Sequence, residues 1–189
     1  MVHMVQNKTN TELEIVLVLI RNKSHLREIA RTLKIPHSTV LRRINELVKR
    51  GVLDYTAEGK NKVFFIKNTL NAKNHVYSAE IYKLSKVIEK NPGLGIILEE
   101  IKNKVPKGMI ILFGSYAKGI EKKESDIDIY VETQDRKIKQ EIQMINSRLS
   151  IKTGGFDMDS LLVKEIIKNH VIVRGLEEFY GKSKFFEKA

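Results

Sequence analysis

Residues 112–131, which carry the strongest structural signal in the chain, read LFGSYAKGIEKKESDIDIYV. The apolar run Met109 to Phe113 predicts a buried strand, and the following Gly114-Ser115 ends that strand and opens a helix. A polar loop then leads to a second strand, Asp126 to Val131, in which Asp126 and Asp128 alternate with apolar residues. Because successive side chains on a strand point to opposite faces, the two carboxylates are expected to share one face.

Two carboxylates on one face suit Mg²⁺ that also binds nucleotide phosphates, because this ion prefers oxygen ligands and keeps open positions. Gly114 would let a phosphate approach the backbone, and Ser115 would add a hydroxyl at a helix start, where free amides favour anions. The spacing from Gly114 to Gly119 is that of a P-loop. Ile120 and Glu121 exclude that motif, because Lys and Ser or Thr are required there.

The segment resembles the nucleotidyltransferase superfamily with the polymerase-beta-like fold, and within it the minimal enzymes with the pattern GSxARG…SDIDL. The matching residues are Gly114-Ser115, Ala117, Gly119 and Ser125-Asp126-Ile127-Asp128, with Lys118 in place of the usual Arg. The resemblance implies a mixed sheet flanked by helices and transfer of a nucleoside monophosphate from an NTP, with ATP favoured, to a hydroxyl acceptor. It also implies two Mg²⁺ ions at Asp126 and Asp128, which act as catalytic residues and metal ligands. Gly114, Ser115 and Lys118 are then expected to bind the nucleotide.

A third carboxylate comes from a later strand in this family, and Asp157 and Asp159 are the candidates. Both share one face if a strand runs from Ile151 to about Met158. Asp157 is favoured as a catalytic residue and metal ligand because it precedes the end of that strand. Asp159 can equally be the N-cap of the helix expected over 161–168.

The N-terminal part predicts three helices followed by two short β-prone segments. The helices cover Thr11–Ile20, the segment after the N-cap candidate Ser24, and the segment from Pro36 to Gly51; the β-prone segments are Val52–Thr56 and Lys62–Ile66. This order resembles the winged helix-turn-helix family over about residues 10–68.

The third of these helices buries Val40, Ile44 and Leu47, and its other residues are candidates for DNA binding in the major groove. The candidates expected to point outward near its start are His37, Ser38, Thr39, Arg42 and Arg43, and those at the tip of the wing are Lys60, Asn61 and Lys62. Residues 1–70 hold thirteen Lys or Arg against six Asp or Glu, which favours a polyanion such as double-stranded DNA as partner. The alternative is a protein-docking module.

The chain is therefore expected to be an α+β protein with a winged helix-turn-helix domain (residues 1–70), a linker helix (71–91) and a nucleotidyltransferase domain (92–189). In the last domain, helices are also expected over about 96–105 and 136–149. Tyr77, Ile81, Leu84 and Ile88 form an apolar seam on the linker helix. This seam would pack against the neighbouring domains or pair with a second copy of the chain as a homodimer.

Composition excludes several other classes of function. The chain has no Cys, and its five His are scattered, so thiolate zinc sites and His clusters are not expected. The longest apolar run, Ile15–Ile20, is too short to span a bilayer, so we expect a cytoplasmic protein without a membrane partner.

The acceptor of the transferred group stays open between a protein hydroxyl, an RNA end and a small alcohol. Minimal enzymes of the resembled family often occur in toxin–antitoxin pairs. The alternative function is a DNA-binding transcriptional regulator whose second domain only senses a nucleotide.

Overall fold

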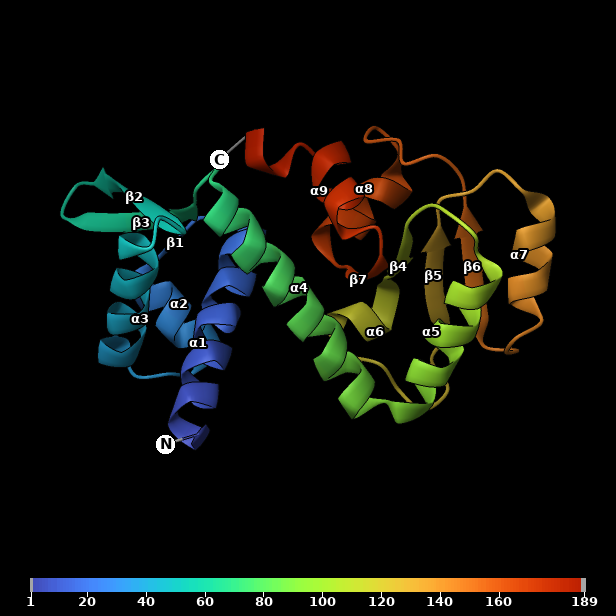
Figure 1. Ribbon diagram of the computed structural model, residues 1–189, viewed down its shortest axis with the longest axis horizontal. Helices are drawn as coiled ribbons and strands as arrows, with labels where there is room; N and C mark the ends of the chain where they lie inside the picture. The colour runs from blue at the N-terminus through green and yellow to red at the C-terminus, as the bar shows by residue number, and fades with distance from the viewer. Residues whose placement is uncertain (1, 188–189) are drawn as a thin grey trace. The chain divides into compact units, whose positions relative to one another are not determined.

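The computed structural model describes residues 2–187, with side chains from residue 10 onward. These residues form two compact units, one made of residues 2–80 and 185–187 and the other of Ile81–Lys184 (Figure 1). No helix in the described part of the chain combines the length and apolar character needed to cross a bilayer.

The first unit packs helices against a small antiparallel sheet with strand order β1-β3-β2. Its helices are α1 (Val2–Arg21), α2 (Leu26–Leu33), α3 (His37–Lys49), the first half of α4 (Leu70–Lys90) and the 3-10 helix η1 (Phe185–Glu187). Its strands are β1 (Ser24–His25), β2 (Leu53–Glu58) and β3 (Asn61–Ile66). The expected three helices followed by a hairpin are confirmed, and the arrangement is a winged helix-turn-helix.

The turn between α2 and α3 is tight because Lys34 adopts a left-handed conformation with φ 54° and Pro36 is the N-cap residue directly before α3. The expected role of Ser24 as a helix N-cap is wrong. Ser24 is buried in β1, where it pairs with Phe64 of β3, and the residue before α2 is His25.

Helix α4 is the expected linker helix. Its first half belongs to the first unit, where Tyr77 meets the ring of Phe186 edge-on at 6.5 Å. Leu84 and Ile88, in its second half, pack against the core of the second unit. Three of the four seam residues are therefore used inside the chain, while Ile81 is 59% exposed.

The second unit is a four-stranded mixed sheet of order β6-β5-β4-β7, in which β5 and β6 are parallel and β4 is antiparallel to both its neighbours. The strands are β4 (Ile110–Leu112), β5 (Ile127–Val131), β6 (Leu149–Thr153) and β7 (Val171–Arg174). The helices are α5 (Pro92–Lys104), α6 (Gly114–Lys118), α7 (Arg136–Gln143), α8 (Leu161–Lys168) and α9 (Leu176–Lys182). The expected mixed sheet flanked by helices is confirmed.

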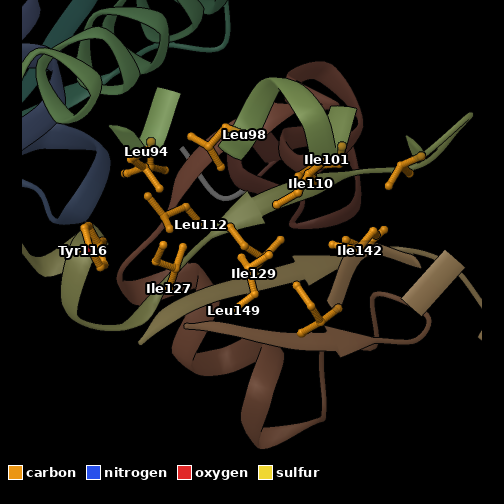
Figure 2. Close-up of a cluster of buried hydrophobic side chains, with 14 residues drawn as sticks. Leu94, Leu98, Ile101, Ile110, Leu112, Tyr116, Ile127, Ile129, Ile142 and Leu149 are labelled. Atoms are coloured by element: carbon orange, nitrogen blue, oxygen red, sulfur yellow. The ribbon is translucent and has the colours of Figure 1, made fainter. Parts of the chain in front are cut away.

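Helices α5 and α7 cover one face of this sheet and build its main core with residues of β4, β5 and β6 (Figure 2). Ile127 and Ile129 of β5 point into that core, so the alternation along the strand places Asp128 and Tyr130 on the opposite face. There Phe156 meets the ring of Tyr130 at 6.1 Å and that of Phe179 from α9 at 5.6 Å.

Several boundaries differ from the expected ones. Helix α1 begins at Val2, nine residues before the expected start at Thr11. Helix α7 ends at Gln143 instead of about residue 149, and its end is tied to the next strand by a hydrogen bond from Gln143 Nε2 to the carbonyl of Leu149. Strand β6 spans Leu149–Thr153 and does not reach Met158, because its partner β5 ends at Val131, opposite Thr153. Residues 154–160 therefore form a loop, and strand parity does not apply to Asp157 and Asp159.

Candidate functional site

The two carboxylates Asp126 and Asp128 stand at the start of β5. Asp128 is the second residue of the strand and is half-buried, whereas Asp126 precedes the strand and is exposed. Within residues 2–187 neither carboxylate has a hydrogen bond or an ion pair, although most other acidic groups near the sheet are paired. Two unneutralised carboxylates only two residues apart in the chain are suited to bind a cation.

Gly114 lies directly against Asp128. The amide of Phe113 donates to the carbonyl of Asp128 at 2.9 Å, which holds the end of β4 beside the start of β5. Gly114 follows with φ 67°, and a β-carbon built on it would overlap Oδ2 of Asp128 and lie 2.9 Å from its Cγ. The absence of a side chain at residue 114 therefore makes room first of all for this carboxylate.

The short helix α6 carries the two other residues expected to bind the nucleotide. Ser115 is half-buried at its first turn, whereas Tyr116 points into the core. Lys118, at the end of the helix, forms an ion pair with Glu165 of α8, with Nζ 2.7 Å from Oε1. This lysine lowers the pKa of the Glu165 carboxyl below its ordinary value. Sequence reasoning missed Glu165, and no local pattern connects it to a residue on another helix.

Asp157 and Asp159 lie in the loop after β6. Oδ1 of Asp157 accepts the amide of Asp159 at 3.0 Å, which closes a small turn. The alternative role of Asp159 as the N-cap of α8 is wrong, because that position belongs to Ser160, whose hydroxyl accepts the amide of Val163 at 3.1 Å. Among residues 2–187, no three His, Cys, Asp or Glu side chains gather closely enough to hold a metal ion. Among these residues, Asp126 and Asp128 at the start of β5 are thus not joined by a third carboxylate.

The donor set nevertheless fits a hard divalent cation such as Mg²⁺. Mg²⁺ is bound in proteins by one or two carboxylates, with its other positions filled by water and substrate phosphates. Asp126 and Asp128 supply two carboxylates without a competing cation, and Gly114 has no side chain that would displace the carboxylate of Asp128.

Four of the eight expected DNA-binding residues line a pocket of about 710 Å³ between α2, the start of α3 and the wing. His37 and all three wing-tip candidates, Lys60, Asn61 and Lys62, belong to its wall, together with Arg27 and Arg31 of α2. Lys62 is held in place by the ring of Tyr55, since its Nζ lies 3.8 Å from the ring centroid. The two arginines of α2 were not among the sequence candidates, although they share the spacing of an exposed helix face.

The other candidates on α3 differ in their exposure. Ser38 and Arg42 are exposed and Thr39 is half-buried. The expected outward position of Arg43 is wrong, because its side chain is only 12% exposed and its Nη1 lies 3.0 Å from Oε2 of Glu46. Residue 43 lies three positions after the buried Val40 and therefore lies close to the inner face of the helix.

Comparisons with known proteins agree with both units. Residues 94–180 match the family model of the nucleotidyltransferase domain, and residues 9–54 match that of the winged helix-turn-helix DNA-binding domain. A solved structure described as "Crystal structure of the toxin-antitoxin with AMP-PNP" is 23% identical, with a TM-score of 0.35, over 57% of this chain and 81% of that one. So distant a likeness carries no argument about function. No curated protein matches the chain.

The unpaired carboxylates on β5, the Gly114 contact and the order of strands and helices agree with the first family model, and the helix-turn-helix and wing agree with the second. The chain therefore joins a winged helix-turn-helix DNA-binding domain to a domain of the nucleotidyltransferase family.

Proposed function

We propose that the second unit transfers a nucleoside monophosphate from an NTP, ATP in the first place, to a hydroxyl group and releases pyrophosphate. The observation that carries this proposal is the pair of unneutralised carboxylates at the start of β5, Asp126 and Asp128, the second of which lies against the side-chain-free Gly114. In the reaction the acceptor oxygen bonds to the α-phosphorus, the bond from that phosphorus to the bridging oxygen breaks, and the hydroxyl proton is lost to water.

Asp126 and Asp128 would hold the Mg²⁺ ions, which supply charge neutralisation for the triphosphate and for the leaving pyrophosphate. Ser115 would donate its hydroxyl to a phosphate oxygen, and Lys118 would add a positive charge. Glu165 keeps the Lys118 ammonium group at the end of α6, so nucleotide phosphates would share this lysine with a carboxylate.

Asp157 is our proposal for the third metal ligand. Its support is the position of the loop that carries it: Phe156, the preceding residue, packs on Tyr130, which shares with Asp128 the face of β5 opposite the main core. The loop is thus anchored on the face of the sheet that carries Asp128.

For the first unit we propose binding of double-stranded DNA through the start of α3 and the wing. His37, Ser38, Thr39 and Arg42 would face the major groove, and Lys60, Asn61 and Lys62 would contact phosphates. The pocket shared by His37 and the wing supports this arrangement, as does the surplus of basic residues in the N-terminal part.

A second candidate function is a transcriptional regulator whose second unit binds a nucleotide without turnover. One observation favours it, namely that among residues 2–187 only two carboxylates come together at the site and no third one joins them. A sensor would bind the NTP, whereas an enzyme would consume it.

The test is incubation of the full chain with each NTP, Mg²⁺ and a cell lysate that supplies acceptors, with measurement of pyrophosphate. An enzyme releases pyrophosphate with at least one NTP, in an amount that rises with time and far exceeds the amount of protein. Saturable binding of an NTP without pyrophosphate above the lysate alone would contradict transfer and support the sensor.

A further inference from the structure

A second pocket lies in the nucleotidyltransferase unit, on the face of the sheet opposite Asp128. It has a volume of about 720 Å³ and is lined by the start of α5, by Tyr116, by the loop after α6 and by Ile127. Figure 2 shows Leu94, Tyr116 and Ile127 together at one end of the core. Because Ile127 points to this side of the sheet, the next residue, Asp128, points to the other side. The pocket is therefore separate from the proposed transfer site.

The wall of this pocket is rich in positive charge. Lys122, Lys123 and Arg148 line it, and the one carboxylate in the wall, Glu121, is already paired with Lys90. Nη1 of Arg148 donates to the carbonyl of Lys123 at 2.9 Å, which fixes the guanidinium beside the lysine loop. Three further cations without a counter-charge in the wall favour an anionic ligand.

The first turn of the thirteen-residue helix α5 adds to this preference. Pro92, Gly93 and Leu94 line the pocket, and the side chain of Asn91 does not cap the helix. Its Nδ2 instead donates to Oε1 of Glu121 at 3.2 Å and to the carbonyl of Val87 at 3.3 Å. A helix start without a side-chain cap favours a phosphate or carboxylate group.

Glu121 adds an independent requirement on the ligand. Its side chain is only 7% exposed, and Oε1 accepts from Lys90, with the Nζ at 2.6 Å, and from Asn91. Its second oxygen, Oε2, is buried and has no hydrogen-bond partner among the described residues. A buried acceptor of this kind is normally satisfied, so it calls for a ligand that donates a hydrogen bond. Carboxylates in nucleotide sites bind ribose hydroxyls in this way.

We propose that this pocket binds a ribose phosphate, either as a free ribonucleotide or as one unit of an RNA strand. The phosphate lies at Lys122, Lys123, Arg148 and the start of α5, and the 2′-hydroxyl of the ribose donates to Oε2 of Glu121. Ile96, which is 67% exposed, offers apolar surface to the base. An acidic peptide meets the same cations and could reach Glu121 only with a backbone N–H, so it is one of the probes below.

The test uses the full chain and isothermal titration calorimetry in EDTA, so that metal-dependent transfer does not contribute. The probes are AMP, its 2′-deoxy counterpart, a short RNA, a DNA of the same sequence and an Asp-rich peptide. The pocket variants are Lys122→Glu/Lys123→Glu and Glu121→Gln. The matched control is Lys137→Glu/Lys139→Glu, which makes the same charge change on exposed residues of α7.

We expect Lys122→Glu/Lys123→Glu to weaken AMP binding by about tenfold or more, since charge-assisted bonds to phosphate are lost, and the α7 control to leave it unchanged. Glu121→Gln is expected to weaken AMP binding by about threefold to tenfold and to change deoxy-AMP binding little, because only AMP carries the 2′-hydroxyl. If RNA binds more tightly than AMP and is weakened equally by Lys122→Glu/Lys123→Glu, the ligand is an RNA strand. If RNA and AMP bind with equal affinity, the ligand is the free nucleotide.

Three results would each overturn the proposal. The lysine variants of the pocket and of α7 could change AMP affinity equally, AMP and deoxy-AMP could bind with the same affinity, or the Asp-rich peptide could displace AMP. Asp128→Asn separates it from the proposed transfer. If AMP binding is lost in that variant, AMP occupies the transfer site and the second pocket is refuted. Unchanged AMP binding in a variant that no longer transfers a nucleotide supports two separate sites.

Discussion

The carboxylate of Asp128 fills the space into which a side chain at residue 114 would project. A β-carbon at Gly114 would lie 2.9 Å from Cγ of Asp128 and would overlap one of its oxygens. The two residues are fourteen positions apart in the chain, and the backbone hydrogen bond from Phe113 to Asp128 brings them together. Gly114 and the carboxylate of Asp128 are thus in direct contact, and a side chain at residue 114 should displace that carboxylate.

We expect Gly114→Ala to displace Asp128 and to abolish nucleotide transfer. The matched control is Gly119→Ala, since Gly119 has φ 71° but would place its β-carbon in open space. Both variants should lose about 1–2 kcal/mol of unfolding free energy because of the left-handed backbone. Only Gly114→Ala should also lose activity. Thermal unfolding and transfer assays on both proteins check this, and equal activity of the two variants would refute the contact as a catalytic requirement.

The place of Asp128 on a strand could be predicted from sequence, because the apolar residues 127, 129 and 131 alternate with it. The strand was expected to start at Asp126 but starts at Ile127, so the shared face of the two carboxylates stays a prediction. The role of Gly114 beside Asp128 could not be predicted, since it depends on how the end of β4 lies against β5. The same holds for Lys118, whose charge was recognised while its partner Glu165 was not.

A second prediction contrasts two adjacent arginines of α3. Arg42 is exposed, and Arg42→Ala should weaken binding to a specific DNA site by about 1–3 kcal/mol if the side chain reads a base. Arg43 is largely buried and paired with Glu46, so Arg43→Ala should lower stability and leave DNA affinity nearly unchanged. Fluorescence anisotropy with duplex DNA over a range of salt concentrations measures the first effect, and thermal unfolding the second. The reverse pattern would mean that Arg43 turns outward on DNA.

The third prediction concerns the cap of α8. Ser160→Ala should lower the unfolding free energy by about 1 kcal/mol because the amide of Val163 loses its partner. Asp159→Asn should be close to neutral, since its carboxylate does not cap the helix. Chemical denaturation of both variants gives the comparison. A larger loss for Asp159→Asn than for Ser160→Ala would show that the cap is wrongly placed.

The fourth prediction concerns the role of Asp157 in nucleotide transfer. We expect Asp157→Asn to reduce nucleotide transfer strongly at unchanged stability of the fold, because we propose this carboxylate as the third metal ligand. Asp159→Asn is the matched control, with the same chemical change two positions away. Wild-type transfer activity in the Asp157→Asn protein would show that Asp157 is not a metal ligand and that the site has only two carboxylates.

The fifth prediction follows from the ion pair of Lys90 and Glu121. Lys90 lowers the pKa of the Glu121 carboxyl below its ordinary value of 4.5. The pair therefore stabilises the folded state above about pH 4.5, and this stability is lost as the pH falls through the lowered pKa. On acidification, the wild-type protein should lose more unfolding free energy than Glu121→Gln. The exposed Glu124→Gln serves as control and should follow the wild type.

Some boundaries of helices and strands are set by residues nearby in the chain and could be predicted, whereas others are set by contacts with distant segments and could not. The α2–α3 turn follows from Lys34 and Pro36, which act within a few residues. The end of β6 at Thr153 follows from the end of its partner β5 at Val131, which the sequence of residues 151–158 does not reveal, so a longer strand was predicted. Ser24, which looks like a helix cap, instead extends the sheet because Phe64 is its cross-strand partner.

The most direct test of the proposed function compares the wild-type chain with Asp128→Asn in the transfer of label from the α-phosphate of ATP to an acceptor in a cell lysate. Asn keeps the size of the side chain but lacks the charge that a metal ion needs, so the fold should persist, as thermal unfolding can verify. We predict labelled product with the wild type and at least about a hundredfold less with Asp128→Asn. Equal labelling by a well-folded Asp128→Asn protein would contradict the assignment of β5 as the catalytic strand.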